Sequence, residues 1–147
     1  MDQIAHIGGG AKLLGLVNPG NDGCAIDGGS VGCSATNGLT THNSGHGLSI
    51  NGTKGFEGSS HNIVRNWTSK FCDEGGVVVT DQGVAGSSPS HNRISDCLVE
   101  NPGERVPESA FSCFGGYDNQ FTNCRARDTR PVKRMTVGYE EGHGVNG

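Results

Sequence analysis

Short alternations of apolar and polar residues, each ending at a polar or glycine turn, run through most of the chain. "NIVRNWTSKF" (62–71) is followed by "DEGGVVVTDQ" (73–82), and "NRISDCLVEN" (92–101) by "ESAFSCFGG" (108–116). "NQFTNCRARD" (119–128) is followed in the same way by "KRMTVGY" (133–139). Alternation with a period of two is typical of β-strands. The pattern therefore predicts many strands of three to five residues.

Three of these segments can be aligned without a gap, which makes the pattern a repeat. The aligned columns are Asn62/Asn92/Asn119, Val64/Ile94/Phe121, Asn66/Asp96/Asn123 and Trp67/Cys97/Cys124. The steps between copies are 30 and 27 residues. Weaker echoes lie upstream in "GCAIDGG" (23–29) and "GHGLSINGT" (45–53). Each repeat holds two or three short strands.

A parallel β-helix accounts for this repeat better than other β architectures. A propeller blade is longer, about 40–50 residues, and carries four strands. In a β-helix each coil stacks on the next, so equivalent residues form columns about 4.8 Å apart. We predict an all-β, right-handed parallel β-helix of about five coils over 23–147, with 1–22 as a lead-in or cap. The chain could equally be a segment of a longer β-helix, and an irregular antiparallel β domain is the alternative fold.

The columns predict specific contacts. We expect Asn62, Asn92 and Asn119 to form a ladder of side-chain amides at a turn. The column of Val64 and the column of Trp67 should face the interior. His61 and His91 also share a column, and we expect their rings to stack at a turn.

Composition supports an all-β domain and limits its partners. Glycine accounts for 26 of 147 residues while hydrophobic residues make up only 32%, and glycine is a poor helix former. The net charge of −4 argues against nucleic acid as the partner. We expect the six cysteines to be free, mostly buried thiols, with Cys24–Cys33 left open as a disulfide. The sequence shows no metal-binding spacing, no apolar run long enough for a membrane span, and no signal peptide.

The phrase His/Asp-Asn-x-apolar-x-Asn/Asp resembles the repeat of the pectate-lyase-like parallel β-helix superfamily, which includes polysaccharide lyases, hydrolases and bacteriophage tailspikes. The likeness covers about residues 45–139. It implies a polysaccharide partner and, for a tailspike, a homotrimer. It implies no cofactor, except calcium if the protein is a lyase. A tailspike would be virion-associated. Otherwise the protein would be cytoplasmic or exported by a non-classical route.

Candidate site residues follow from this resemblance. Glycoside hydrolysis needs two carboxylates about 5–9.5 Å apart, which stacked coils can supply. Glu74, Glu108 and Glu141 each stand just ahead of a short apolar strand, in the similar phrases "EGGVVV", "ESAFSC" and "EGHGV". They could form a catalytic column with Asp73 beside it. Solvated turn residues are the plainer interpretation.

Substrate-binding candidates are aromatic and histidine residues next to turns or glycines. They are Tyr117, Tyr139, His46 and His143. Tyr117 and Tyr139 are expected at turns, where their rings could contact a sugar. His46 and His143 share the phrase Gly-His-Gly, in which the glycines allow a close approach of the backbone.

Three functions remain open from the sequence. The first is a phage tailspike or tail-fibre segment that recognises, and in one version degrades, a host surface polysaccharide. The second is a cellular polysaccharide lyase or glycoside hydrolase, although 147 residues is short for such an enzyme. The third is a structural β-solenoid without enzymatic activity.

Overall fold

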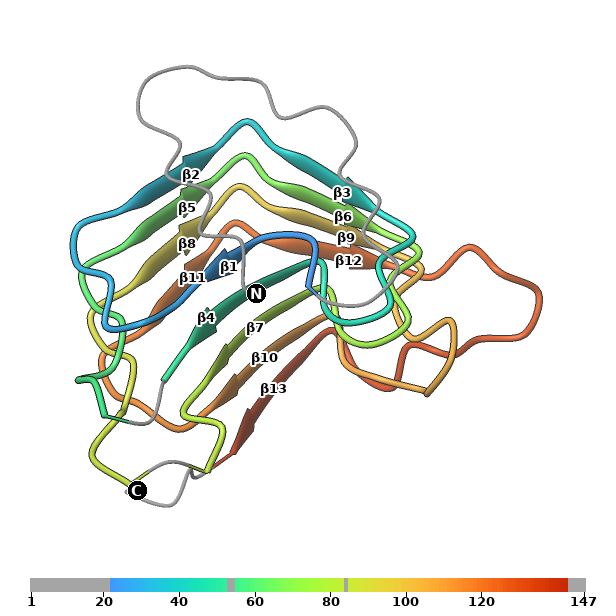
Figure 1. Ribbon diagram of the computed structural model, residues 1–147. Coiled ribbons are helices and arrows are strands. Elements are labelled where there is room, and N and C mark those ends of the chain that lie inside the picture. Colours follow the sequence, from blue (N-terminus) through green and yellow to red (C-terminus); the bar gives the residue numbers. More distant parts are fainter. Residues whose placement is uncertain (1–21, 53–54, 84, 143–147) are drawn as a thin grey trace.

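Three parallel sheets of short strands make up the described part of the chain, residues 22–52, 55–83 and 85–142, in a computed structural model (Figure 1). Sheet 1 contains β1 (Ala25–Ile26), β4 (Leu48–Asn51), β7 (Val77–Thr80), β10 (Phe111–Phe114) and β13 (Tyr139–Gly142). Sheet 2 contains β2 (Ser34–Thr36), β5 (Ile63–Arg65), β8 (Arg93–Ser95) and β11 (Gln120–Thr122). Sheet 3 contains β3 (Leu39–Thr41), β6 (Thr68–Lys70), β9 (Leu98–Glu100) and β12 (Arg125–Arg127).

Successive strands belong to successive sheets, so three strands form one coil of a solenoid. Four such coils are present, and β13 begins a fifth. Every strand pair within the sheets is parallel. In Figure 1, sheets 2 and 3 meet in a chevron that stands over sheet 1. The predicted all-β parallel solenoid is confirmed with about four turns, and the antiparallel alternative is wrong.

The aligned columns of the sequence are the true register of the coils. Val64 pairs with Ile94, and Ile94 pairs with Phe121. Val64, Ile94 and Trp67 are fully buried, as predicted for interior columns. Phe121 belongs to the last complete coil and is only partly buried. The interior is therefore a continuous apolar stack that opens at the C-terminal end.

Gly23, Gly47 and Gly76 are needed because sheets 1 and 3 approach closely where the coils enter sheet 1. Register places one small residue there in every coil, in the column Gly23, Gly47, Gly76, Ala110 and Gly138. A Cβ on Gly76 would overlap the methyl groups of Val99, and one on Gly47 would overlap the side chain of Ser69. Glycine thus brings sheet 1 into contact with sheet 3 at this corner.

The column of Asn66, Asp96 and Asn123 forms the corner between sheets 2 and 3, where the backbone turns, and Asn37 extends it by one coil. Its four residues adopt left-handed backbone conformations: Asn37 (φ 57°), Asn66 (52°), Asp96 (55°) and Asn123 (51°). Asparagine and aspartate tolerate this conformation better than other non-glycine residues. Asn66 Nδ2 also donates to Asn37 Oδ1 at 2.8 Å, which links neighbouring coils.

The predicted asparagine ladder and histidine stack are both present. Asn62 Nδ2 donates to Asn92 Oδ1 at 3.0 Å, and Asn92 Nδ2 donates to Asn119 Oδ1 at 2.9 Å. The rings of His61 and His91 stack with centroids 4.8 Å apart. All six cysteines are free thiols, which removes the Cys24–Cys33 disulfide that the sequence left open.

Of the predicted lead-in 1–22, only Asp22 lies within the described residues. In the described part of the chain, no helix is long and apolar enough to cross a membrane.

Candidate functional site

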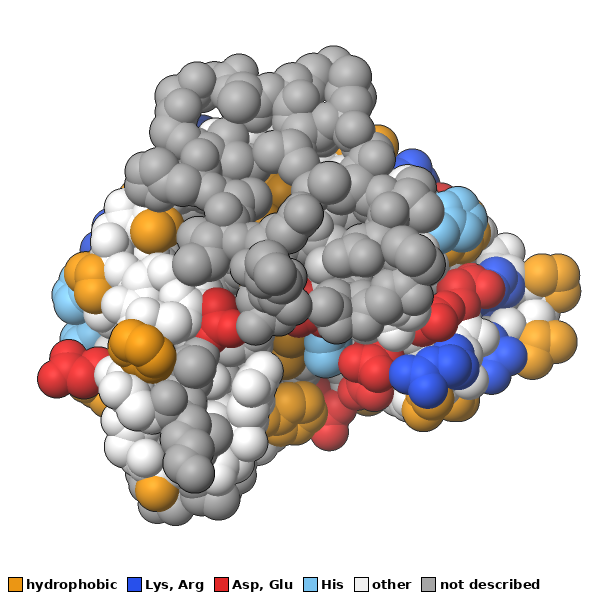
Figure 2. All heavy atoms as spheres, viewed as in Figure 1, with side chains coloured by type: hydrophobic (Ala, Val, Ile, Leu, Met, Phe, Trp, Pro, Cys, Tyr) orange, Lys and Arg blue, Asp and Glu red, His pale blue; other side chains and the backbone are white. Residues whose placement is uncertain are grey.

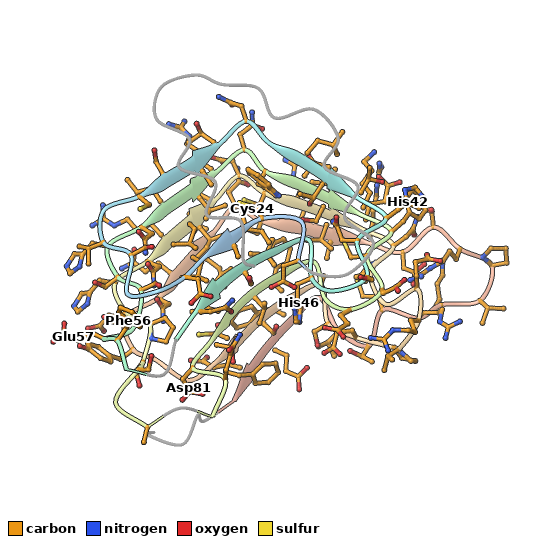
Figure 3. The ribbon with its side chains drawn as sticks, viewed as in Figure 1. Cys24, His42, His46, Phe56, Glu57 and Asp81 are labelled. Atoms are coloured by element: carbon orange, nitrogen blue, oxygen red, sulfur yellow. The ribbon has the colours of Figure 1, made fainter. Side chains whose placement is uncertain are left out.

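Charged side chains gather where the coils enter sheet 1, at a site we call the entry corner: Asp22, His46, Glu74 and Glu108. Asp22, Glu74 and Glu108 precede the first residues of β1, β7 and β10 by three residues. His46 precedes the first residue of β4 by two. Figure 3 shows His46 at the start of β4, and Figure 2 shows acidic and basic side chains side by side on the right of this face. Because the coils stack, the site runs along the solenoid axis.

His46 is the centre of the entry corner. The backbone N of His46 donates a hydrogen bond to Asp22 Oδ1 at 2.8 Å. The ring Nδ1 of His46 lies 3.1 Å from the same oxygen. Glu74 Oε2 lies 3.6 Å from the same ring nitrogen. Burial alone would lower the pKa of His46, but the hydrogen bond to Asp22 and the charges of Asp22, Glu74 and Glu108 outweigh it and raise that pKa.

The pKa of Asp22 moves in the opposite direction. Burial alone would raise it, but hydrogen bonds from His46 and Ser49 stabilise the carboxylate and lower the pKa below its ordinary value. The side chains of Asp22 and His46 are only 21% and 26% exposed. They form a partly buried ion pair when His46 is protonated.

Arg105 joins Glu74 to the predicted residue Asp73. Its Nη2 donates to Glu74 Oε1 at 2.8 Å, and its Nε lies 3.8 Å from Asp73 Oδ2. Arg105 comes from the loop between β9 and β10, which also forms backbone hydrogen bonds with Cys72 and Asp73. Asp73 therefore belongs to the rim of the entry corner.

Glu74 and Glu108 occupy the same place in neighbouring coils. The register of β7 with β10 places Val77 beside Phe111, so Glu74 stands beside Glu108 three residues earlier. A Cβ on Gly75, between them, would contact both the His46 ring at 3.3 Å and Glu108 Cγ at 3.4 Å. The two carboxylates and the imidazole thus meet around a glycine.

Glu141 does not belong to this column, contrary to the sequence interpretation. It lies inside β13 and pairs with Cys113, whereas Glu108 forms its bridge with Met135. The strand begins at Tyr139, ahead of the phrase "EGHGV", so the apparent likeness to "EGGVVV" was out of register. Instead, Glu140 faces outward and accepts a hydrogen bond from Ser109.

The other substrate-binding candidates lie elsewhere. Tyr117 is 58% exposed and contacts His91 edge-on at 5.3 Å, at the corner that leads into sheet 2. Tyr139 is a strand residue rather than a turn residue, and it packs on Phe121 at the open end. His143 lies outside the described residues. Of the candidates, the structure brings together Glu74, Glu108, Asp73 and His46.

Asp22 and Arg105 are the site residues that sequence reasoning missed. The coil that joins β1 to β4 is short: Ala25 pairs with Ser49, 24 residues on. The aligned repeats step by 30 and 27 residues, so Asp22 falls outside their frame. Arg105 lies in the loop between β9 and β10, which is longer than the loops that precede β4 and β7, so no residue of those coils aligns with it.

The entry corner can bind and orient hydroxyl or acidic groups and exchange a proton through His46. Within the described residues, no group of three histidine, cysteine or acidic side chains is arranged to hold a metal ion. Comparison of the chain with protein-family models, with curated proteins and with solved structures gives no match. The parallel β-solenoid therefore stands on the register of its own strands.

Proposed function

We propose that the protein is a carbohydrate-binding β-solenoid, of the kind found in phage tailspikes, and that it binds a polysaccharide along the entry corner. One observation carries the proposal: Asp22, His46, Glu74 and Glu108 line the same corner of successive coils. A linear polymer that lies along the solenoid axis would meet these groups in sequence. Carboxylates accept hydrogen bonds from sugar hydroxyls, and Arg105 and protonated His46 donate them.

The resemblance of the repeat to pectate-lyase-like proteins supports this proposal. The excess of carboxylates over cationic groups at the entry corner also supports it. Under it, the protein acts as a homotrimer on a host surface polysaccharide. Trp67 is fully buried and takes no part, so recognition rests on polar groups more than on aromatic stacking.

Hydrolysis of the bound polysaccharide is a second candidate, favoured by the neighbouring carboxylates. One coil spacing, about 4.8 Å, is close to the 5–5.5 Å that separates the two carboxyl groups of retaining glycosidases. In this version Glu108 and Glu74 are the acid and the nucleophile, in an order that the geometry leaves open. His46, beside Glu74, would then position that carboxylate.

The test is a panel of bacterial capsular and O-antigen polysaccharides with pectin and alginate. Binding is measured by titration calorimetry, and cleavage by new reducing ends and by absorbance of unsaturated uronates. Glu74→Gln and Glu108→Gln should weaken binding about 10- to 100-fold, the loss expected for a charged hydrogen bond. Glu57→Gln is the matched control, because Glu57 is exposed and lies on the other side of the molecule (Figure 3).

Each outcome has a definite meaning. Cleavage that Glu74→Gln and Glu108→Gln abolish would establish a hydrolase, and uronate absorbance would indicate a lyase instead. Binding without cleavage would establish a recognition protein. No binding across the panel, or equal loss in Glu57→Gln, would contradict the proposal and favour a structural solenoid.

A further inference from the structure

Cys97 and Cys124 stack on one another at the corner between sheets 2 and 3. Ser95 pairs with Thr122 before them, and Leu98 pairs with Arg125 after them. The two cysteines are therefore in register on neighbouring coils, about 4.8 Å apart along the stack. This spacing falls within the Cα separation of about 4.4–6.8 Å that a disulfide spans.

The two thiols affect one another's protonation, while Cys97 Sγ donates to the backbone O of Ser95 at 3.2 Å and Cys124 Sγ to that of Thr122 at 3.5 Å. The neighbouring Cys97 thiol lowers the pKa of Cys124, because it stabilises the Cys124 thiolate. The neighbouring Cys124, together with burial, raises the pKa of Cys97. The pair thus divides into a more acidic and a less acidic thiol.

Access divides the pair in the same way. Cys97 is 2% exposed. Cys124 belongs to the last complete coil of the described residues and is only partly buried, and it lines a hollow there with Phe121, Ala126 and Tyr139. A reagent can therefore reach Cys124 first, and Cys97 only through Cys124.

We propose that Cys97 and Cys124 form a thiol–disulfide exchange site for small-molecule disulfides, with Cys124 as the attacking thiol and Cys97 as the resolving thiol. The Cys124 thiolate attacks one sulfur of the small disulfide, forms a mixed disulfide and releases one small thiolate. Cys97 then loses its proton to solvent and attacks Cys124 Sγ. This step forms the Cys97–Cys124 bond and releases the second thiolate. Overall, two protein thiols are oxidised and one small disulfide is reduced to two thiols.

The remaining cysteines do not share this arrangement. Burial raises the pKa of Cys24 to about 12 and that of Cys72 to about 11, and a high pKa leaves little thiolate to react. Burial also raises the pKa of Cys113. Cys33 is only partly buried and can react independently, so the test is best made in a Cys33→Ser chain.

The test uses 5,5′-dithiobis(2-nitrobenzoate), an aromatic disulfide whose released thiolate absorbs visible light. The folded, reduced Cys33→Ser chain should release two thiolates per molecule in a fast phase. Its intact mass should fall by two hydrogens without an adduct, and proteolysis should yield a cross-linked peptide that contains Cys97 and Cys124. Addition of Cys97→Ser should halve the release and leave a stable adduct on Cys124. Addition of Cys124→Ser should slow the fast phase at least tenfold.

A stable adduct on Cys124 in the Cys33→Ser chain, with no cross-linked peptide, would overturn the proposal. A fast phase that survives Cys124→Ser would also overturn it. Thermal unfolding of each variant checks that the native fold is retained. If Cys97→Ser fails to fold, the cross-linked peptide of the Cys33→Ser chain decides the question alone.

Discussion

Ile63 and Ile94, which lie in neighbouring coils and differ by one position in register, should differ in their tolerance of a charged substitution. Ile94 in β8 points into the core and is fully buried, whereas Ile63 in β5 points outward and is 45% exposed. Ile63 pairs with Arg93, which shows that a charged side chain is accepted at that position. The direction of a side chain in this fold follows from its place in the column, not from its type.

Ile94→Asp should therefore unfold the protein, while Ile63→Asp should be tolerated. A carboxylate buried without a partner costs several kcal/mol, about 4 or more at Ile94. At Ile63 the loss should stay below about 1 kcal/mol. Urea unfolding followed by circular dichroism measures both. Equal destabilisation by the two variants would mean that the register is wrong.

The ion pair between His46 and Asp22 predicts a pH-dependent stability. The pKa of His46 is raised in the folded state, so its contribution is fully present below the unfolded value of about 6.5 and is lost as pH rises through the folded value. The pKa of Asp22 is lowered, so its contribution is lost only as pH falls below about 4 through its folded value.

His46→Gln should accordingly lower the Tm by a few degrees near pH 5.5 and by less near pH 9. Differential scanning fluorimetry across this range measures the difference from the wild-type chain. His42→Gln is the control, because His42 is exposed, stacks on Phe71 and lies outside the entry corner, so its loss does not affect the ion pair with Asp22. A Tm loss that is the same at both pH values would exclude the ion pair as its cause.

At the scale of elements, the sequence predicts the coils best where the columns hold residues of one type. The Asn62, Asn92 and Asn119 column was predictable because each amide meets a like amide one coil away. The first coil was harder to identify, since Gly38 stands where Trp67 stands one coil later. A Cβ on Gly38 would overlap the Trp67 ring. The Trp67 ring therefore requires glycine at the equivalent position of the preceding coil.

Register also explains which site residues the sequence predicts. Glu74 and Glu108 each precede an apolar strand by three residues, and the pairing of β7 with β10 places them side by side. The column proposed for Glu141 fails because β13 starts at Tyr139, a shift that no residue type marks. Asp22 is missed because the first step between coils is short.

Loss of one ladder amide should destabilise more than its own hydrogen bonds suggest. Asn92 Oδ1 accepts from Asn62, and Asn92 Nδ2 donates to Asn119 and to the backbone O of Ser59. Asn92→Ala leaves buried polar partners unpaired, at about 1–3 kcal/mol for each. We expect a loss of about 3 kcal/mol in urea unfolding. Gln120→Ala, at an exposed position of β11, is the control and should cost less than about 1 kcal/mol; a loss as small for Asn92→Ala would contradict a stabilising ladder.

The whole described solenoid ends in an open coil. Strands β11, β12 and β13 each have a neighbour on one side only, and Phe121, Cys124 and Ala126 are only partly buried there. Open strand edges favour association with other chains, and an inward-pointing charge is a known protection against it. Glu141 fits this role, since it continues the interior column of Ile50, Val79 and Cys113.

Glu141→Val should therefore promote end-to-end association, because it replaces the only charged member of that column with an apolar residue that another coil could cover. Glu140→Val is the matched control: it removes the same charge one residue away, on the outward side where Glu140 accepts from Ser109. Sedimentation velocity over a range of concentrations should show larger species for Glu141→Val and none beyond the wild-type assembly for Glu140→Val. Association by both variants would implicate the loss of net charge, and association by neither would mean that the end is protected by other residues. Association by Glu141→Val alone would show that one charge in an interior column limits stacking between chains, because the apolar columns by themselves would accept a further coil.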